Sequence, residues 1–136
     1  MNKLPGQIIA IEAYGSVAIV DVQVGAHQFT ATLLGATDHL EAWKTGQVVS
    51  LLFKETEVAL AKNLSGQISL RNRMASTITA IEYGQLLTRV LINMDGFELS
   101  SVITTRSARS LAFAVGDQVE GLVKSNEMSL FVGDVL

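Results

Sequence analysis

Cysteine is absent from this 136-residue sequence, and aromatic residues make up only 6% of it. Without cysteine the chain can form no disulfide, no thiolate nucleophile and no cysteine-based metal site. The scarcity of aromatic rings disfavours a surface on which nucleic-acid bases would stack. The two histidines, His27 and His39, have no suitably spaced partners, so we expect neither a metal site nor a catalytic base.

Long apolar runs and a positive net charge are also absent. No hydrophobic stretch approaches the roughly 20 residues that a membrane-spanning helix requires. Residues 1–5 lack the charged and apolar regions of a signal peptide, so we expect a cytoplasmic protein that does not enter a membrane. The net charge of −3 disfavours general nucleic-acid binding, because such binding needs a positive surface that displaces counterions.

Arginine is missing from the first half of the chain. All five arginines follow residue 70, whereas the first half carries lysine alone as its strong cation. Arginine is the planar cation that binds anions through two parallel hydrogen bonds. We therefore expect any oxyanion site to be built mainly from the second half.

What the sequence does contain is a repeat. Hydrophobic residues make up 49% of the chain, which indicates a folded core, and residues 8–12 (IIAIE) return as 78–82 (ITAIE). The same shift of 70 residues maps Gly46 onto Gly116 and Lys54 onto Lys124. Residues 4–8 also resemble residues 64–68, which would imply a shift of 60 residues, but only the shift of 70 runs through the whole unit. We therefore predict a first repeat at 1–64 and a second repeat at 65–136.

Each repeat has the pattern of an OB-like barrel. Alternating apolar residues predict strands at 7–12, 16–24, 28–34, 48–53 and 56–61, and then at 77–82, 86–93, 97–104, 118–123 and 127–132. Short helices are predicted at 37–43 and 107–113, with Thr37 and Ser107 as N-caps, and Asp95-Gly96 is a hairpin signal. The predicted fold is therefore all-β: two tandem OB-like five-stranded barrels, each with one short helix between strands three and four.

The segment 68–72 marks the beginning of the second repeat. We expect it to be extended, which puts Ser69 and Arg71 on the same side of the chain, because strand side chains alternate. A hydroxyl and a guanidinium beside backbone N–H groups form an oxyanion-binding pair. A polar linker between two domains would read the same way, so this segment alone leaves both interpretations open.

Three segments together resemble one known family. Ser69-Leu70-Arg71-Asn72 resembles the Ser-Ala-Arg-Asn motif that opens the Mop domain of the molbindins. Residues 103–111 resemble that family's entry into its helix, and residues 122–128 resemble its lysine segment between strands four and five. The chain is therefore similar to a tandem di-Mop molbindin, and also to the ligand-sensing region of a molybdate-dependent transcription regulator.

The resemblance implies an oligomeric protein that binds molybdate or tungstate between subunits, with no enzymatic activity, metal or further cofactor. A homotrimer is favoured over a dimer, because standalone di-Mop proteins of the family form trimers. Leu70 replaces the family's usual small residue, so its backbone N–H is the expected contact. Carried over by position, the oxyanion-binding residues are Ser69, Leu70, Arg71, Asn72, Thr104, Ser107, Lys124 and Ser125.

These residue types suit a tetrahedral dianion, which accepts hydrogen bonds and cannot donate them. The first repeat lacks most of them. Leu34 stands at the position of Thr104, and Glu55 stands at the position of Ser125, although Lys54 and Thr37 keep a cation and a hydroxyl. We therefore expect the first repeat to be mainly structural.

Two functions remain open on the sequence. One is cytoplasmic storage, homeostasis or sensing of molybdate or tungstate. The other is a regulatory OB-like domain of a molybdate ABC-importer ATPase or of a transcription regulator, acting by protein contact. We expect no nucleic-acid binding by this chain alone, because no helix-turn-helix segment precedes the first repeat. No nucleophile–base pair is visible either, which disfavours an enzyme.

Overall fold

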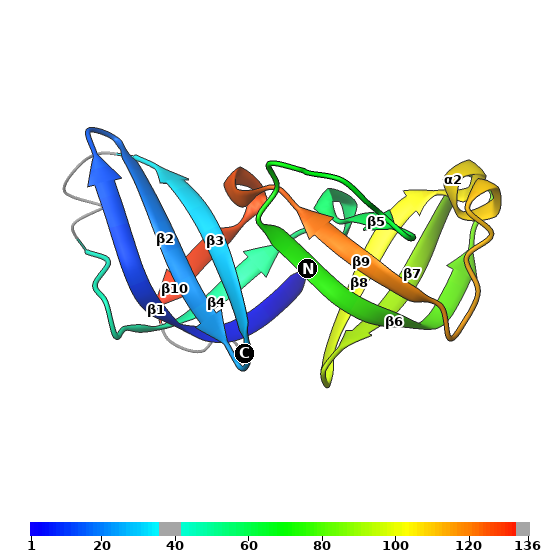
Figure 1. Cartoon of the computed structure of the whole chain (residues 1–136), viewed down its shortest axis with the longest axis horizontal. Helices are drawn as coiled ribbons and strands as arrows, with labels where there is room; N and C mark the ends of the chain where they lie inside the picture. Colours follow the sequence, from blue (N-terminus) through cyan, green and yellow to red (C-terminus); the bar gives the residue numbers. More distant parts are fainter. Residues whose placement is uncertain (36–41, 133–136) are drawn as a thin grey trace. The chain divides into compact units, whose positions relative to one another are not determined.

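The computed structural model describes residues 1–35 and 42–132 (Figure 1). No helix in this part of the chain has both the length and the apolar character needed to cross a membrane. Its elements, in chain order, are β1 (Asn2–Tyr14), β2 (Val17–Val24), β3 (His27–Leu34), β4 (Val48–Phe53), the 3₁₀ turn η1 (Glu55–Glu57), β5 (Ala59–Ala61), β6 (Asn72–Tyr83), β7 (Leu87–Met94), β8 (Phe97–Thr104), α2 (Thr105–Ser110), β9 (Gln118–Val123), the 3₁₀ turn η2 (Ser125–Glu127) and β10 (Ser129–Val132).

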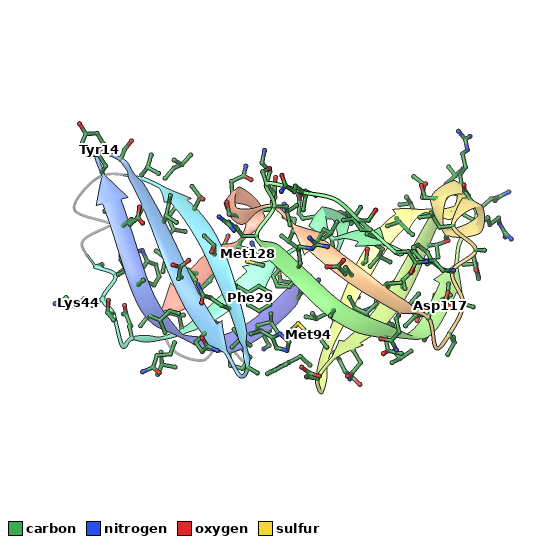
Figure 2. The ribbon with its side chains drawn as sticks, viewed as in Figure 1. Tyr14, Phe29, Lys44, Met94, Asp117 and Met128 are labelled. Carbon is green, nitrogen blue, oxygen red and sulfur yellow. The ribbon has the colours of Figure 1, made fainter. Side chains whose placement is uncertain are left out.

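The strands form two five-stranded sheets. The first has the order β10-β4-β1-β2-β3 and the second has the order β5-β9-β6-β7-β8. The hairpin pairs β1–β2, β2–β3, β6–β7 and β7–β8 are all antiparallel. Within each sheet, apolar side chains alternate between a buried and an exposed face. Figure 2 shows two of the buried side chains of the first sheet's core, Phe29 and Met128, and one of the second's, Met94. The predicted all-β, tandem OB-like architecture is confirmed.

The hairpins follow from local turn chemistry. In the β7–β8 hairpin, Asp95 and Gly96 both have positive φ, at 49° and 93°. Two consecutive residues of positive φ make a turn whose twist matches that of the flanking strands. The Gly96 N–H donates to the Asn93 Oδ1 at 2.9 Å, which closes the turn. The predicted hairpin at Asp95-Gly96 is therefore confirmed.

The last strand of each sheet comes from the other repeat. β10 pairs with β4, with Ser129 opposite Leu52, and β5 pairs with β9, with Ala59 opposite Leu122. One compact unit therefore comprises Met1, Lys3–Phe53 and the chain from Lys124 onward, and the second comprises Asn2 and Lys54–Val123. These compact units do not coincide with the sequence repeats 1–64 and 65–136, because the chain changes sheet directly before each 3₁₀ turn.

Several predicted boundaries are wrong. β1 and β6 begin five residues earlier than predicted, at Asn2 and Asn72. β6 can be this long because Asn72–Thr77 pair with β9 while Thr77–Tyr83 pair with β7, and an irregularity between Ile78 and Ala80 accommodates the change of partner. The predicted fifth strands, 56–61 and 127–132, instead begin with the 3₁₀ turns η1 and η2.

The helix predicted at 107–113 begins earlier, at Thr105, and ends at Ser110. Its first-repeat counterpart, predicted at 37–43 with Thr37 as its cap, lies largely outside the described residues. The described part of the chain therefore confirms one short helix between strands three and four, in the second repeat.

The fragment 65–136, expressed alone, is expected to fold only as a dimer or a larger assembly. A monomer would leave the outer edge of β9 without its partner β5, and an open strand edge recruits another chain. β10 can take that place in a second copy, because it pairs with β4 in the same register in which β5 pairs with β9. Light scattering and far-ultraviolet circular dichroism test this. A folded monomeric fragment would contradict it, and the full chain serves as the control.

Candidate functional site

The Ser-x-Arg-Asn segment lies at the entrance to β6. Asn72 opens the strand and is fully buried, whereas Ser69 and Arg71 are exposed and Leu70 is half-buried. The segment before Asn72 is not a strand, and Ser69 lies in a bend, so the expectation of an extended chain across 68–71 is wrong. The register pairs Asn72 with Val123, the residue that directly precedes Lys124.

Arg71 differs from its neighbour Arg73 in its electrostatic surroundings. Arg73 is held by the Glu120 carboxylate through two hydrogen bonds of 2.6 and 2.7 Å, and this pairing lowers the pKa of Glu120. Among the described residues, neither the Arg71 side chain nor the Lys124 side chain has a hydrogen-bonding or ion-pair partner, and both residues are exposed. Arg71 and Lys124 are thus cations available to an external anion, whereas Arg73 is already committed to a carboxylate.

Thr104 and Ser107 meet at the start of α2. The N-cap is Thr104, whose Oγ1 accepts the Ser107 backbone N–H at 3.1 Å. The Thr104 hydroxyl in turn donates to the Ser107 Oγ at 2.8 Å. The prediction of Ser107 as the cap is therefore wrong by three residues. Because Ser107 Oγ accepts from Thr104, its own hydroxyl proton is free to point toward a ligand.

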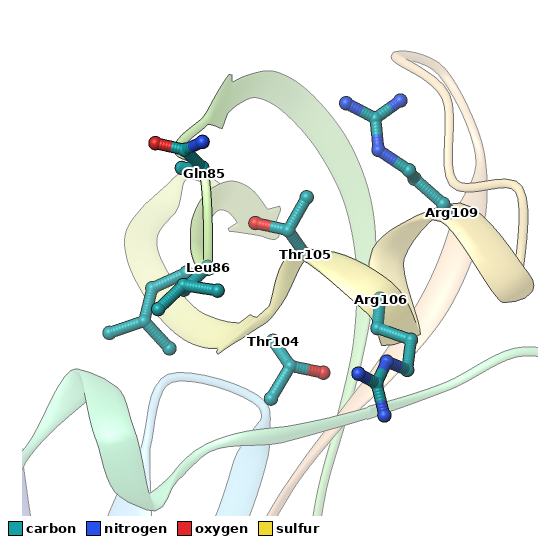
Figure 3. A pocket seen from close by; sticks show the side chains of 7 residues that line it. Gln85, Leu86, Thr104, Thr105, Arg106 and Arg109 are labelled. Carbon is teal, nitrogen blue, oxygen red and sulfur yellow. The ribbon is translucent and has the colours of Figure 1, made fainter.

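A pocket of about 560 Å³ opens beside this helix entry (Figure 3). Thr104 lines it, together with the exposed leucines Leu86 and Leu87 and the side chains of Arg106 and Arg109. The Arg109 guanidinium lies over the Tyr83 ring, 5.0 Å from its centroid. This cation–π contact orients Arg109, so of the two arginines here only Arg106 is without such a contact among the described residues.

Lys124 and Ser125 lie at the beginning of η2. Ser125 Oγ is 2.8 Å from Thr32 Oγ1 on β3, and Ser125 is half-buried. Thr32 is a hydroxyl residue that the sequence analysis missed, and the repeat gives no signal for it, because its counterpart is Val102. Lys124 and Ser125 belong to the first compact unit, whereas the other six predicted residues belong to the second. The structure thus brings Thr104 to Ser107 and Ser125 to Thr32, while convergence of the whole set on one ion stays a prediction.

Asn2 is a second residue that the sequence analysis missed. Its Nδ2 donates to the Ser100 carbonyl and its Oδ1 accepts the Ser100 N–H, both at 2.8 Å, and its side chain is buried. The shift of 70 maps Asn2 onto Asn72, so extending the repeat to the first strand residues would have found it. Both long strands therefore begin with a buried asparagine, which indicates a structural role for this residue of the motif.

Glu55, at the position that matches Ser125, lies among donors. Its carboxylate accepts hydrogen bonds from the Ser100 hydroxyl and from Arg89 Nε, the latter at 3.0 Å. The Ser100 hydrogen bond, followed by the Arg89 guanidinium, holds the pKa of Glu55 below its usual value. Glu55 is therefore charged at neutral pH. In residues 1–35 and 42–132, no three His, Asp or Glu side chains are grouped so as to hold a metal ion.

Comparison with known proteins yields a family and a fold. Residues 1–60 and 68–130 match the model of the TOBE domain. The molybdenum import ATP-binding protein ModC of Brucella abortus (strain 2308) is 30% identical over 123 residues, covering 90% of this chain and 32% of the relative. The molybdenum transport protein ModE of Azotobacter vinelandii is 36% identical over 72 residues, covering 52% of this chain and 27% of the relative. The matched part of the chain thus spans about a third of the length of ModC and about a quarter of the length of ModE.

One solved structure matches nearly the whole chain. The cytoplasmic molybdate-binding protein ModG, in a crystal form with molybdate bound, superposes with a TM-score of 0.91. The match covers 97% of this chain and 96% of that one, at 24% sequence identity. At this identity the likeness establishes the tandem OB-like fold.

Proposed function

Because the chain belongs to the TOBE-domain family, we propose that it is a cytoplasmic protein that binds molybdate or tungstate for storage, homeostasis or sensing. The relatives named above support this ligand class, since one imports molybdenum, another serves molybdenum transport and the structural match binds molybdate in the cytoplasm. The proposed role is binding rather than catalysis.

The observation that carries the proposal is the state of Arg71. This arginine directly precedes the buried Asn72, is exposed, and has no ion-pair partner in the described part of the chain. Lys124 is in the same state, and Ser69, Thr104, Ser107 and Ser125 supply hydroxyl groups. Two cations and several neutral donors match a dianion that has four acceptor oxygens.

We place the binding sites between subunits of a homo-oligomer, with a trimer favoured over a dimer. An OB-like barrel of this size has an interior filled by its own side chains, so it cannot enclose a dianion. Five of the predicted residues are exposed, so a second copy can complete the coordination of the ion: Ser69, Arg71, Thr104, Ser107 and Lys124. Closed symmetry is the usual result of such an arrangement.

A second candidate function is favoured by one observation. The match to ModC includes 90% of this chain but only about a third of that relative. The chain could therefore act as a regulatory region that reports oxyanion binding to an importer ATPase or to a transcription regulator. Both candidates use the same oxyanion site. They differ in whether a partner protein changes the affinity for the ion, since such coupling is reciprocal.

The chain is expected to bind molybdate and tungstate in preference to sulfate and phosphate. Sulfate is smaller than molybdate and would leave some donors without a partner, at a cost of about 1–3 kcal/mol each. Isothermal titration calorimetry with the four oxyanions measures this preference. Equal affinities for sulfate and molybdate, or no heat with any oxyanion, would contradict the proposal.

Arg71→Ala and Lys124→Ala are each expected to weaken molybdate binding by roughly 2–5 kcal/mol, because each removes a charge-assisted partner from the site. Lys54→Ala is the matched control for Lys124, and Arg73→Ala is the control for Arg71, since Arg73 is paired with Glu120. Both controls should bind nearly as the wild type does. If Lys54→Ala is as damaging as Lys124→Ala, both repeats carry sites and the proposed asymmetry is wrong.

Molybdate is expected to stabilise the oligomer, because a ligand bound between subunits favours the assembled state by mass action. Multi-angle light scattering over a dilution series, with and without molybdate, should show dissociation shifting to lower protein concentration when the ion is present. A monomer at micromolar concentration that binds molybdate without any change of mass would rule out sites between subunits.

A further inference from the structure

The two 3₁₀ turns have the same backbone conformation. The residue that precedes each turn is a lysine, with φ and ψ of −75° and 147° at Lys54 and of −68° and 143° at Lys124. In both turns the third residue's N–H donates to that lysine's carbonyl, at 3.0 Å from Glu57 and 2.9 Å from Glu127. Glu55 and Ser125 therefore occupy equivalent positions, each as the first residue of its turn.

The side chains at this first position differ in charge. Ser125 presents a hydroxyl, which the proposed site uses as a donor to the oxyanion. Glu55 instead presents a carboxylate, whose Oε1 accepts from both the Ser100 hydroxyl and Arg89 Nε. At the first turn, the Glu55 carboxylate thus stands where the second turn has the Ser125 hydroxyl, which is expected to bind an oxyanion from solution.

Ser100, one of the two donors around Glu55, is held in place by the surrounding structure. Asn2 fixes both backbone polar groups of Ser100, and Ser100 is only 5% exposed. The Ser101 hydroxyl donates to the Val58 carbonyl at 2.6 Å, which attaches the end of the turn to β8. A donor that is fixed in advance binds an anion without a further ordering cost of its own.

We propose that the Glu55 carboxylate is a built-in anion that fills an oxyanion-binding position beside Arg89 and Ser100 and so keeps free oxyanions out of it. The ligand class in this inference rests on the proposed function. A carboxylate tethered in the turn competes at a high effective concentration, so it excludes an ion that is present in solution at a much lower concentration.

This arrangement differs from an ordinary surface ion pair. In the pair between Arg73 and Glu120, two side chains meet across neighbouring strands and no hydroxyl takes part. Around Glu55, a buried serine hydroxyl and a guanidinium approach one carboxylate oxygen from β8 and β7. A hydroxyl and an arginine are also the donor types of the proposed oxyanion site, in Ser69 and Arg71.

The test is to remove the built-in anion and count bound ions. Glu55→Ala and Glu55→Ser are dialysed against molybdate, and separately against sulfate and phosphate, and bound molybdenum, sulfur or phosphorus per chain is measured by elemental analysis. Each variant is expected to gain one equivalent of oxyanion per chain over the wild type. The gain should be lost in Glu55→Ala/Arg89→Ala. Glu57→Ala, which removes a glutamate from the same turn, is the matched control and should show no gain.

Each outcome is decisive. No gain in a folded Glu55→Ala or Glu55→Ser protein, as judged by circular dichroism, would overturn the proposal. A gain that persists without Arg89, or an equal gain in Glu57→Ala, would also overturn it, because the extra ion would then reflect only the reduced negative charge. A wild-type chain that binds no molybdate would contradict the proposed function instead, while an Arg89-dependent gain with any of the three oxyanions would still support the built-in anion.

Discussion

Each sheet in this protein depends on a strand that the other repeat supplies. A strand at the edge of a sheet exposes backbone groups that need partners, and β4 and β9 find theirs in β10 and β5. The two pairings have equivalent registers, so the exchange is symmetric along the chain. It also determines where the chain changes sheet, directly before Lys54 and Lys124. The position of both lysine turns is thus a consequence of completing two hydrogen-bonded ladders.

Each of the two long strands, β1 and β6, begins with a buried polar residue, Asn2 and Asn72. Asn2 forms hydrogen bonds with both the N–H and the carbonyl of Ser100. If either group were buried without a partner, the folded state would be destabilised by roughly 1–3 kcal/mol. Glu55 and Arg89 extend this network from the same serine. The surroundings of the first 3₁₀ turn therefore contain a connected network of polar groups, in which Ser100 joins Asn2 to Glu55.

The fold could be predicted from the sequence because the evidence for it is local. Alternating apolar residues, turn signals such as Asp95-Gly96 and the repeat at 70 residues define ten strands in the right order. The strand exchange could not be predicted, because residues 59–61 and 129–131 are equivalent in the repeat and fit either sheet. The bend at Ser69 and the capping role of Thr104 were not predicted either. Both depend on how the chain enters a strand or a helix, whereas the prediction used the periodicity of apolar residues within these elements. For the candidate site, residue types were predictable, whereas Thr32, Asn2 and the partners of Glu55 depend on contacts between distant segments.

The exchange of strands has a consequence for how such a chain can evolve. After a duplication, a copy that no longer contributes to binding would normally be free to decay or to be deleted. Here the first repeat cannot be deleted without removing β5 from the second sheet, and β10 would lose β4 as its partner. Selection on the second repeat therefore preserves the framework of the first, while leaving exposed positions such as Leu34 free to change. A chain with this topology can thus accumulate point substitutions in one repeat and still keep both of its repeats.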